Sequence, residues 1–456
     1  MTGLPAYGEA PFSVREKHPM PHITRRGLAA ATAVLLGATA LTACGSADSG
    51  DKAGAESGPV SLTYWAWAPG MDKVAALWNA EHPDIQVTVQ KQASGDDLVT
   101  KIITATKAHK GPDLVQAEYQ ALPTLVSNDS LADIASEVPG VKDEFASGIW
   151  QQTTFGGEAV YALPQDSGPL MFFYREDLFE QYGLTVPTTW DEFAATARTL
   201  KKKAPGKSLT TFSANDSGLF AGLSQQAGAK WWSFEGDTWK VGIDDTATKK
   251  VTDFWGGLVA EGAIDNQPMY TPAWNKAMNT GEQLAWVSAV WAPGTLTTAA
   301  PDGKGKWAMA PLPQWTKGEN ATGSWGGSST AVTSDSKHKA AAAKFAVWLN
   351  TDPKALAALV KESGIYPAAT AAQTSGALAK APDYFANQPD FYTRAAEIAK
   401  TTAPAAWGPN VNVAYTAFKD EFGKAAKAKS GFDTALTALQ NATVADLKKQ
   451  GFEVAP

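Results

Sequence analysis

The chain has 456 residues, of which 44% are hydrophobic and 19% charged, so it is long enough for two globular domains that each bury a core. Its single cysteine excludes an internal disulfide, a thiol pair and a cysteine-rich zinc site, and its five scattered histidines give little basis for a histidine metal site. The formal charge of −7 argues against binding of nucleic acid, and the 17 tryptophans indicate apolar surfaces built for contact.

The N-terminal segment has the features of an export signal. Arg25 and Arg26 precede an apolar run over 27–43 that is short and rich in small residues, which argues against a retained transmembrane helix. Residues 1–19 fit no signal region, so Met20 is the better start. The arginine pair resembles a twin-arginine signal, and an ordinary basic region fits equally well.

Cys44 directly follows Leu41-Thr42-Ala43, which resembles a bacterial lipobox. We therefore predict a signal peptide over 1–43 and a lipid anchor on Cys44; a plain signal peptide with an incidental cysteine is the alternative. Residues 44–59 are polar and small without apolar periodicity, which predicts a flexible tether. The protein is thus expected to be exported and held by lipid on the outer face of the cell membrane.

Three β-α steps follow the tether. Residues 61–67 and 85–89 have the composition and alternation of strands, and a third strand is expected from Pro112 to Gln116. Helical apolar spacing follows the first two strands, around Trp78 and Ile102. This alternation predicts a parallel sheet with crossover helices.

Helices and short strands are expected in the rest of the chain. Thr189 and Glu192 form a capping box, which predicts a helix from there to Lys203. Four further elements are predicted, in order a hairpin, a helix, a strand and a helix, over residues 231–243, 245–261, 328–333 and 340–350.

The segment Leu163 to Phe193, LPQDSGPLMFFYREDLFEQYGLTVPTTWDEF, resembles the signature of the family 1 extracellular solute-binding proteins, the sugar-capturing lipoproteins of bacterial ABC importers. The resemblance covers essentially the whole mature chain and is greatest to carbohydrate importers of high-GC Gram-positive bacteria. Further segments carry it in the same order, at residues 65–67, 112–116, 291–294, 326–329, 344–350 and 407–410.

The resemblance implies an α/β fold with two lobes, the type II periplasmic-binding-protein-like fold, with a ligand cleft between lobes joined by a multi-segment hinge. We place one lobe at 60–162 plus 312–363 and the other at 163–311 plus 364–456. The implied function is extracellular capture of a mono- or oligosaccharide and its delivery to ABC permease subunits with a cytoplasmic ATPase. The resemblance also implies a monomer without cofactor or metal. Ligands of open α/β sheets bind beyond the carboxyl ends of the strands, which agrees with a cleft.

A sugar has an apolar C–H face and hydroxyls that both donate and accept, so its site combines aromatic rings with planar polar side chains. Trp67, Glu118 and Tyr119 follow predicted strands, and Asp166 lies at the crossing between lobes. The remaining candidates lie in loops or at element ends flanked by Gly and Pro: Trp274, Trp291, Trp325, Tyr366, Trp407 and Asn410.

Each candidate has a structural alternative. Asp166 and Glu118 would also serve as helix caps or hinge acceptors, and the loop tryptophans would also pack in a core. Four tryptophans fall on helix faces at core spacing and are assigned to packing: Trp78, Trp190, Trp255 and Trp348. Three stay undecided between a core, a hairpin platform and a ligand contact: Trp231, Trp232 and Trp239.

The competing function class is a secreted glycosidase, because paired carboxylates and tryptophans also serve sugar hydrolysis. The chain contains no G-x-S-x-G, H-E-x-x-H or phosphate-loop motif. Ser334 to Lys337 matches S-x-x-K, but it lies in a polar turn where an acylating serine is not expected. A purely structural lipoprotein leaves the loop tryptophans unexplained. We therefore expect a binding protein and not an enzyme.

Overall fold

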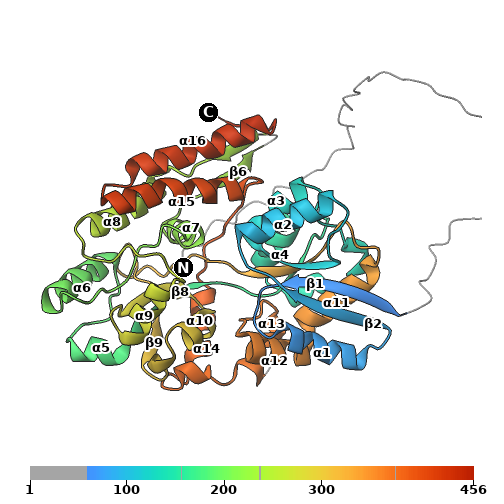
Figure 1. The fold of residues 1–456 in the computed structure, drawn as a ribbon, viewed down its shortest axis with the longest axis horizontal. Helices are drawn as coiled ribbons and strands as arrows, with labels where there is room; N and C mark the ends of the chain where they lie inside the picture. Colours follow the sequence, from blue (N-terminus) through green and yellow to red (C-terminus); the bar gives the residue numbers. More distant parts are fainter. Residues whose placement is uncertain (1–58, 156, 236–237, 375, 456) are drawn as a thin grey trace, which may run out of the picture. The chain divides into compact units, whose positions relative to one another are not determined.

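The computed structural model describes residues 59–455 except 156, 236–237 and 375. The predicted signal peptide, Cys44 and nearly all of the predicted tether lie outside the described residues. Two lobes, each with its own sheet and core, make up the described chain, on the right and left of Figure 1. In the part of the chain that is described, no helix combines the length and apolar character needed to cross a bilayer.

The first lobe is built on a five-stranded sheet with the order β2-β1-β3-β10-β4. β1 pairs in parallel with β2 and β3, which confirms the predicted β-α alternation, while β10 runs antiparallel between β3 and β4. Its strands are β1 Val60–Ala66, β2 Ile85–Lys91, β3 Leu114–Glu118, β4 Leu163–Pro164 and β10 Ser328–Val332. Its helices are α1 Met71–Glu81, α2 Asp96–Lys107, α3 Leu122–Ser127, α4 Ser147–Thr154, α11 Lys339–Thr351, α12 Pro353–Ala358 and α13 Thr370–Thr374.

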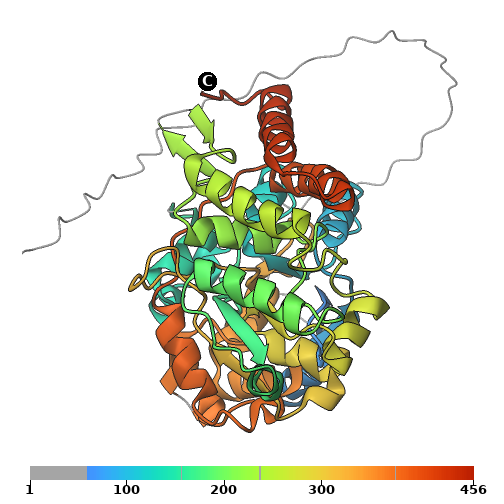
Figure 2. The ribbon, with the colours of Figure 1, turned by 90° about the vertical axis from the view of Figure 1, so that its left-hand side faces the viewer.

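The second lobe has an antiparallel sheet of order β8-β5-β9 and a separate hairpin, β6-β7, which confirms the predicted hairpin. Helices α15 and α16, red in Figures 1 and 2, pack side by side. The strands are β5 Leu170–Arg175, β6 Trp232–Glu235, β7 Thr238–Val241, β8 Ala285–Ala289 and β9 Trp307–Ala310. The helices are α5 Glu176–Gln181, α6 Trp190–Lys203, α7 Ser217–Gln226, α8 Thr246–Ala260, α9 Pro272–Thr280, α10 Ala292–Ala299, α14 Phe391–Ala399, α15 Val411–Ala428 and α16 Asp433–Lys449.

The chain passes between the lobes at points that differ from those predicted. Leu163 belongs to the core of the first lobe, although the second lobe was expected to begin there. Leu312 and Trp325 pack in the core of the second lobe, and Ile365 and Ala369 in that of the first, so the predicted boundaries at 311/312 and 363/364 also lie too early. Apolar spacing shows that a segment is buried but not which of two cores it joins.

Three segments lie side by side where the chain crosses between the lobes. Asp166 pairs with Pro367, and Pro169 pairs with Ser324, each in an isolated antiparallel bridge. These three segments form the expected multi-segment hinge. Because rotation of one lobe against the other must bend all three together, the hinge limits the motion to a defined direction.

The hinge backbones approach so closely that one position allows no side chain. The backbone N–H of Trp325 donates to the Gly168 carbonyl oxygen over 2.8 Å. A Cβ added at Gly168 would clash with the Trp325 carbonyl oxygen. Glycine at 168 is therefore required by backbone packing between two hinge segments.

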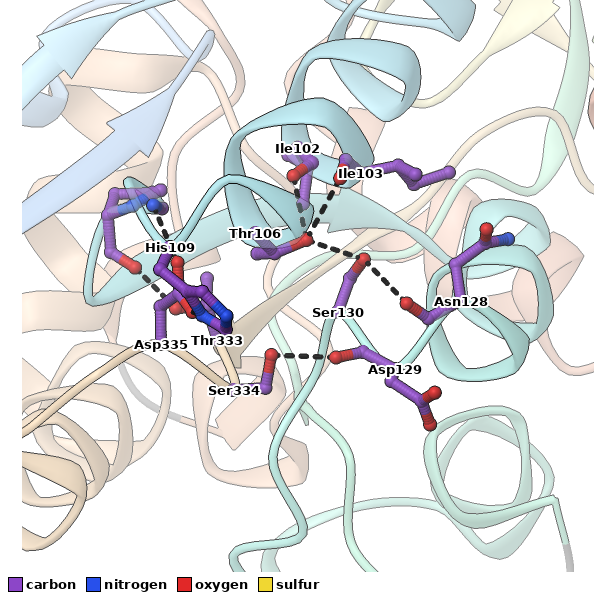
Figure 3. A network of polar contacts seen from close by, with 12 residues as sticks. Ile102, Ile103, Thr106, His109, Asn128, Asp129, Ser130, Thr333, Ser334 and Asp335 are labelled. Carbon is purple, nitrogen blue, oxygen red and sulfur yellow. Dashed lines mark hydrogen bonds and ion pairs between the residues drawn. The ribbon is translucent and has the colours of Figure 1, made fainter. Parts of the chain in front are cut away.

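Figure 3 shows a polar network near the start of β3. Asp335, in the loop after β10, accepts a hydrogen bond from the Gly111 N–H over 2.8 Å and lies 3.2 Å from His109 Nδ1. The hydroxyls of Thr106 on α2 and Ser130 lie 2.9 Å apart. These contacts fasten the loop before β3 to the loop after β10, and α2 to the segment that follows α3.

The tryptophans assigned to packing lie where helix periodicity predicted. Trp78, Trp190 and Trp255 are buried, and Trp348 packs partly buried against the core of the first lobe. Among the undecided three, Trp231 and Trp232 are buried in the core of the second lobe. Trp239 packs partly buried against the same core. Most of the tryptophan content thus stabilises the two lobes.

The predicted capping box at the start of α6 is present, and it gives a test of helix stability. Thr189 Oγ1 accepts from the Glu192 N–H over 3.1 Å, and Glu192 accepts in return from the Thr189 N–H. We expect Thr189→Ala to lower the free energy of unfolding by about 1 kcal/mol, measured by urea denaturation. Thr104→Ala, at an exposed position within α2, is the control and should not destabilise. Equal stability of the two variants would contradict a role for the cap.

Candidate functional site

Acidic side chains gather where the carboxyl ends of β2 and β3 meet the second lobe. Glu118 is the last residue of β3, and Asp96 begins α2 after β2. Asp216 caps α7 in the second lobe and accepts from the Leu219 N–H over 3.3 Å. The charges of Asp96, Asp216 and the hinge residue Asp166 all raise the pKa of Glu118, so the four carboxyls lie within electrostatic reach.

The environment of these carboxyls favours their protonated forms. Burial first of all, and then the neighbouring charges of Asp96, Asp216 and Asp166, raise the pKa of Glu118 to about 8. Burial also raises the pKa of Asp216 to about 7 and that of Asp166 to about 6. Asp166 shifts least because its Oδ1 accepts from both the backbone N–H and the hydroxyl of Ser328. All three groups therefore titrate closer to neutral pH than free carboxyls do.

Lys419 on α15 connects the two lobes through this group. Its Nζ lies 2.7 Å from Asp96 Oδ2, and its charge lowers the pKa of both Glu118 and Asp216. A second interlobe contact is the hydrogen bond that Thr124 Oγ1 donates to the Pro409 carbonyl oxygen over 2.9 Å. The two lobes are thus in direct contact in this structure.

Tyr270 lies beside the carboxyls and keeps solvent contact. Its side chain is 48% exposed, and its backbone has a left-handed φ of 63°. Even so, burial raises the pKa of Tyr270 well above its ordinary value, and Asp216 and Glu118 add to the rise. With about half of the residue exposed, Tyr270 is accessible to a ligand near the acidic group.

Four tryptophans form a continuous aromatic cluster behind Tyr270. The ring of Trp274 is 5.4 Å from that of Tyr270 and 5.2 Å from that of Trp286. Trp286 contacts Trp291 at 5.9 Å, and Trp291 contacts Trp325 edge to face at 4.8 Å. The Trp291 indole N–H also donates to the Trp325 carbonyl oxygen over 3.1 Å. Edge-to-face packing of this kind makes a rigid wall.

Tyr415 contributes a buried hydroxyl without a hydrogen-bond partner among the described residues. The side chain is 6% exposed and lies one turn before Lys419 on α15. Burial raises the pKa of Tyr415 well above its ordinary value, and the charges of Glu118, Asp96 and Asp216 contribute. Its hydroxyl therefore lies within the electrostatic influence of the acidic group, with its hydrogen-bonding capacity unused among the described residues.

The structure brings five of the sequence-predicted residues to this region. Glu118 and Asp166 belong to the acidic group, and the Tyr119 hydroxyl donates to the Asp166 carbonyl oxygen over 2.8 Å. Trp291 and Trp325 belong to the aromatic cluster. The Trp325 side chain also lowers the pKa of Asp216, which links the two groups. We call these residues together with Asp96, Asp216, Tyr270, Tyr415 and Lys419 the interlobe site.

Trp67 lies at the carboxyl end of β1, as predicted, and is partly buried. Its backbone N–H donates to Gln116 Oε1 over 3.1 Å, so the amide of Gln116 holds the loop at this strand end. This places Trp67 on the same sheet edge as Glu118, where it packs against a core cluster that includes Tyr119. Its ligand role stays a prediction.

Three other predicted residues are core residues in this structure. Trp274 and Asn410 have no exposed surface, and Tyr366 has 2%. The Asn410 amide donates to the Thr443 carbonyl oxygen over 2.9 Å, and its position at the start of α15 makes it a structural link to α16. None of the three presents a surface to a ligand here. Their flanking Gly and Pro residues indicated the ends of elements but not the direction of the side chains.

Trp407 packs partly buried against the core of the second lobe. Its ring lies 6.3 Å from that of the buried Trp232, and its indole N–H is buried without a partner among the described residues. A Cβ at the next residue, Gly408, would also clash with the Trp232 ring. The segment is therefore held by core packing around Trp232.

Five residues of the interlobe site were not predicted: Asp96, Asp216, Tyr270, Tyr415 and Lys419. The position of Asp96 after the second strand was a usable signal, because it is the same sheet edge as that of Glu118. Tyr415 and Lys419 lie within a long amphipathic helix, where local sequence gives no such signal. The acidic residues do not form a metal centre, since no three His, Cys, Asp or Glu side chains of the described chain are placed to hold an ion.

The raised pKa of Glu118 predicts how stability changes with pH. Because the pKa is about 8 in the folded state and 4.5 in the unfolded state, the folded state binds this proton more tightly. The stabilisation is complete below pH 4.5 and is lost as the pH rises through about 8. We expect the melting temperature to fall over this range less in Glu118→Gln than in the unmodified protein.

The matched control for this prediction is Glu261→Gln. Glu261 forms an exposed ion pair with Arg198, and its pKa is lowered, so its contribution is lost only as the pH falls below its folded pKa. Glu261→Gln should therefore keep the normal fall in melting temperature between about pH 5 and pH 9. If the melting temperature of Glu118→Gln falls with pH as steeply as that of the unmodified protein, Glu118 does not control the pH dependence of stability.

The fold and the interlobe site define a class of protein: two α/β lobes that close about a multi-segment hinge, with polar and aromatic side chains at their junction. The profile of the bacterial extracellular solute-binding protein family matches residues 63–356, more than half of the chain. The chain belongs to this family, and it is therefore an exported solute-binding protein. Family membership favours binding over the glycosidase alternative.

Relatives and solved structures agree with this assignment. The lactose-binding protein of Rhizobium radiobacter is 28% identical over 348 residues, which cover 72% of this chain and 79% of the relative. The galacto-N-biose/lacto-N-biose I-binding protein of the ABC transporter from Bifidobacterium longum, in complex with lacto-N-biose, superimposes with a TM-score of 0.80 and 29% identity over 88% of this chain and 100% of that one. An ABC-transporter-associated binding protein from B. animalis subsp. lactis, in complex with β-1,6-galactobiose, gives a TM-score of 0.80 and 26% identity over 87% and 100%.

Proposed function

We propose that this protein captures a mono- or oligosaccharide at the interlobe site and delivers it to the permease of an ABC importer. The observation that carries the proposal is the approach of Glu118 and Asp216, from different lobes, beside the accessible ring of Tyr270. Carboxyl oxygens accept hydrogen bonds from sugar hydroxyls, and an aromatic ring contacts the C–H face. The saccharides bound by the relatives support the same ligand class.

The proposed cycle uses the hinge. A ligand that contacts carboxyls of both lobes binds the closed arrangement more tightly than the open one and so shifts the population toward closure. The Asp96–Lys419 ion pair forms across the same junction and assists closure, by about 1 kcal/mol or less because it is partly exposed. A micromolar dissociation constant corresponds to about −8 kcal/mol, within reach of a stacked ring and several paired hydroxyls. The closed form then docks on the permease and releases its cargo.

The experiment that tests the ligand class is a titration with plant and microbial saccharides, followed by tryptophan fluorescence. The aromatic cluster lies at the junction, so closure on a sugar should change the emission. Failure of every saccharide to bind, together with hydrolysis of a chromogenic glycoside, would instead support the enzyme alternative.

We also propose that Cys44 carries a lipid that anchors the protein, with 44–59 as the tether. The support is the unique cysteine directly after Leu41-Thr42-Ala43. Cys44→Ser should release the protein into the medium, and its continued retention in the membrane fraction would refute the anchor. The anchored protein is proposed to act as a monomer.

A further inference from the structure

Gly218 lies in the first turn of α7, two residues after Asp216, which caps this helix. Its backbone is helical and has no left-handed φ, so its conformation suits any residue. Within a helix, glycine is less favourable than alanine because it loses more conformational freedom on folding. Local structure therefore gives no reason for a glycine here, and the reason must lie in what packs against α7.

The indole of Trp325 packs directly on Gly218. A Cβ added at this glycine would lie 2.9 Å from Cδ1 and 3.0 Å from Nε1 of Trp325. Non-bonded carbon atoms pack at about 3.5–4.0 Å, so there is no room for a side chain between the helix and the ring. The same Cβ would lie 3.8 Å from Asp216 Oδ1. Interatomic distances thus bring Trp325, Gly218 and the Asp216 carboxyl together at the start of α7.

The backbone that carries Trp325 is fastened to the same face of α7. Gln225 Oε1 accepts from the Ser324 N–H over 2.9 Å, and a Cβ added at Gly222 would clash with the Ser324 carbonyl oxygen. Residues 218, 222 and 225 are spaced by four and three positions, so they lie on one side of the helix. Since the backbone at Ser324 is held, a side chain at position 218 would have to turn the Trp325 indole and not move its whole segment.

Trp325 in turn holds Trp291, which keeps partial exposure. The Trp291 indole N–H donates to the Trp325 carbonyl oxygen over 3.1 Å, and the two rings pack edge to face with centroids 4.8 Å apart. This hydrogen bond uses the only donor of the Trp291 side chain, so its ring face is what remains for a ligand. Turning the Trp325 indole would remove the ring contact that sets the tilt of Trp291.

We propose that Gly218 is a positioning residue of the interlobe site: because it has no side chain, the Trp325 indole can occupy the place from which it fixes the Trp291 ring for contact with a sugar. This inference rests on the proposed saccharide-binding function. Gly218 acts through Trp325 and needs no contact with the ligand. Binding groups must be held within about 0.5 Å of their productive positions, and moving the indole from 2.9 Å to ordinary contact with a Cβ exceeds that tolerance.

The test compares Gly218→Ala with Gly257→Ala, a matched glycine within α8 whose added Cβ meets no atom within 4 Å. Isothermal titration with the saccharide that binds most tightly in the titration panel should show binding at least about fivefold weaker in Gly218→Ala and unchanged in Gly257→Ala. Near-ultraviolet circular dichroism of the unliganded protein should change only in Gly218→Ala, because it reports on the packing of tryptophan rings. Equal affinity in both variants overturns the inference.

A double-mutant cycle assigns the effect to the contact with Trp325. Once Trp325→Ala has removed the indole, adding Gly218→Ala should weaken binding by less than about twofold and leave the near-ultraviolet spectrum unchanged. The spectrum keeps the cycle readable if Trp325→Ala binds too weakly to titrate. A further loss of affinity, or a further spectral change, in the double variant would show that Gly218 acts by another route and overturns the inference.

The same double variant covers a failure to fold. If Gly218→Ala alone does not fold, the double variant should fold, because its Cβ no longer meets an indole; failure of both overturns the steric contact. If the unmodified protein binds a saccharide and Gly218→Ala binds it equally well, this inference fails while the proposed function stands. If no saccharide binds the unmodified protein, the proposed function and this inference both fail.

Discussion

Tyr270→Ala is expected to weaken saccharide binding more than tenfold while leaving the protein folded. Tyr270 lies within the electrostatic influence of Glu118 and Asp216, and 48% of the residue is exposed. Truncating a central aromatic residue of a binding site typically costs about 2 kcal/mol or more, which is more than tenfold in affinity. Alanine bears the left-handed backbone at this position much as tyrosine does, so the loop should keep its conformation.

The measurement is a fluorescence titration of Tyr270→Ala with the best saccharide of the panel, alongside thermal unfolding. Phe234→Ala is the matched control, because Phe234 is 42% exposed on the β6-β7 hairpin and belongs to no part of the interlobe site. It should leave affinity unchanged. Normal affinity of Tyr270→Ala would mean that the sugar does not contact this ring.

The second large effect is expected at the hinge. Gly168→Ala places a Cβ against the Trp325 carbonyl oxygen, a backbone atom that no rotamer change can move away. The two hinge segments must separate, which disrupts the hydrogen bond between them and displaces Trp325 from Trp291. Overpacking of this kind costs about 1–3 kcal/mol or more. We therefore expect both a lower melting temperature and weaker saccharide binding.

Gly148→Ala separates this steric effect from the general loss of a glycine. Gly148 lies in α4 with no atom within 4 Å of its added Cβ, so the substitution should be neutral or slightly stabilising. Differential scanning calorimetry of the two variants makes the comparison. If Gly168→Ala melts at the same temperature as Gly148→Ala, the hinge segments have more freedom than their packing indicates.

Much of the fold was predictable because its signals are local. The strand and helix alternation over 61–116, the Thr189–Glu192 capping box and the tryptophan-rich hairpin each depend on residues close together in the chain, and all three are confirmed. The lobe crossings depend instead on which core a segment joins. Leu312 and Ile365 have the same apolar character, yet they pack in different lobes. That choice is made by tertiary contacts.

The same distinction applies to the interlobe site. Glu118 and Asp166 were predictable because strand ends and crossings lie at the ligand edge of α/β sheets. Tyr415 and Lys419 reach the site only because α15 packs over the junction, which no local pattern indicates. Trp274 was predicted to contact a ligand but lies in the core. Pro272 begins helix α9, and this helix directs the Trp274 indole inward against Trp286.

The position of β10 in the first sheet sets an order for folding during synthesis. β10 comes late in the chain, yet it fills the place between β3 and β4, so both of these strands have an unpaired edge until it emerges. By contrast, β5, β8 and β9 are all translated before β10, so the second sheet is complete first. A nascent chain therefore carries an open β-edge in its first lobe for much of its synthesis, and open edges pair readily with other chains. Aggregation of truncated or stalled chains should accordingly start at β3, the strand that carries Glu118.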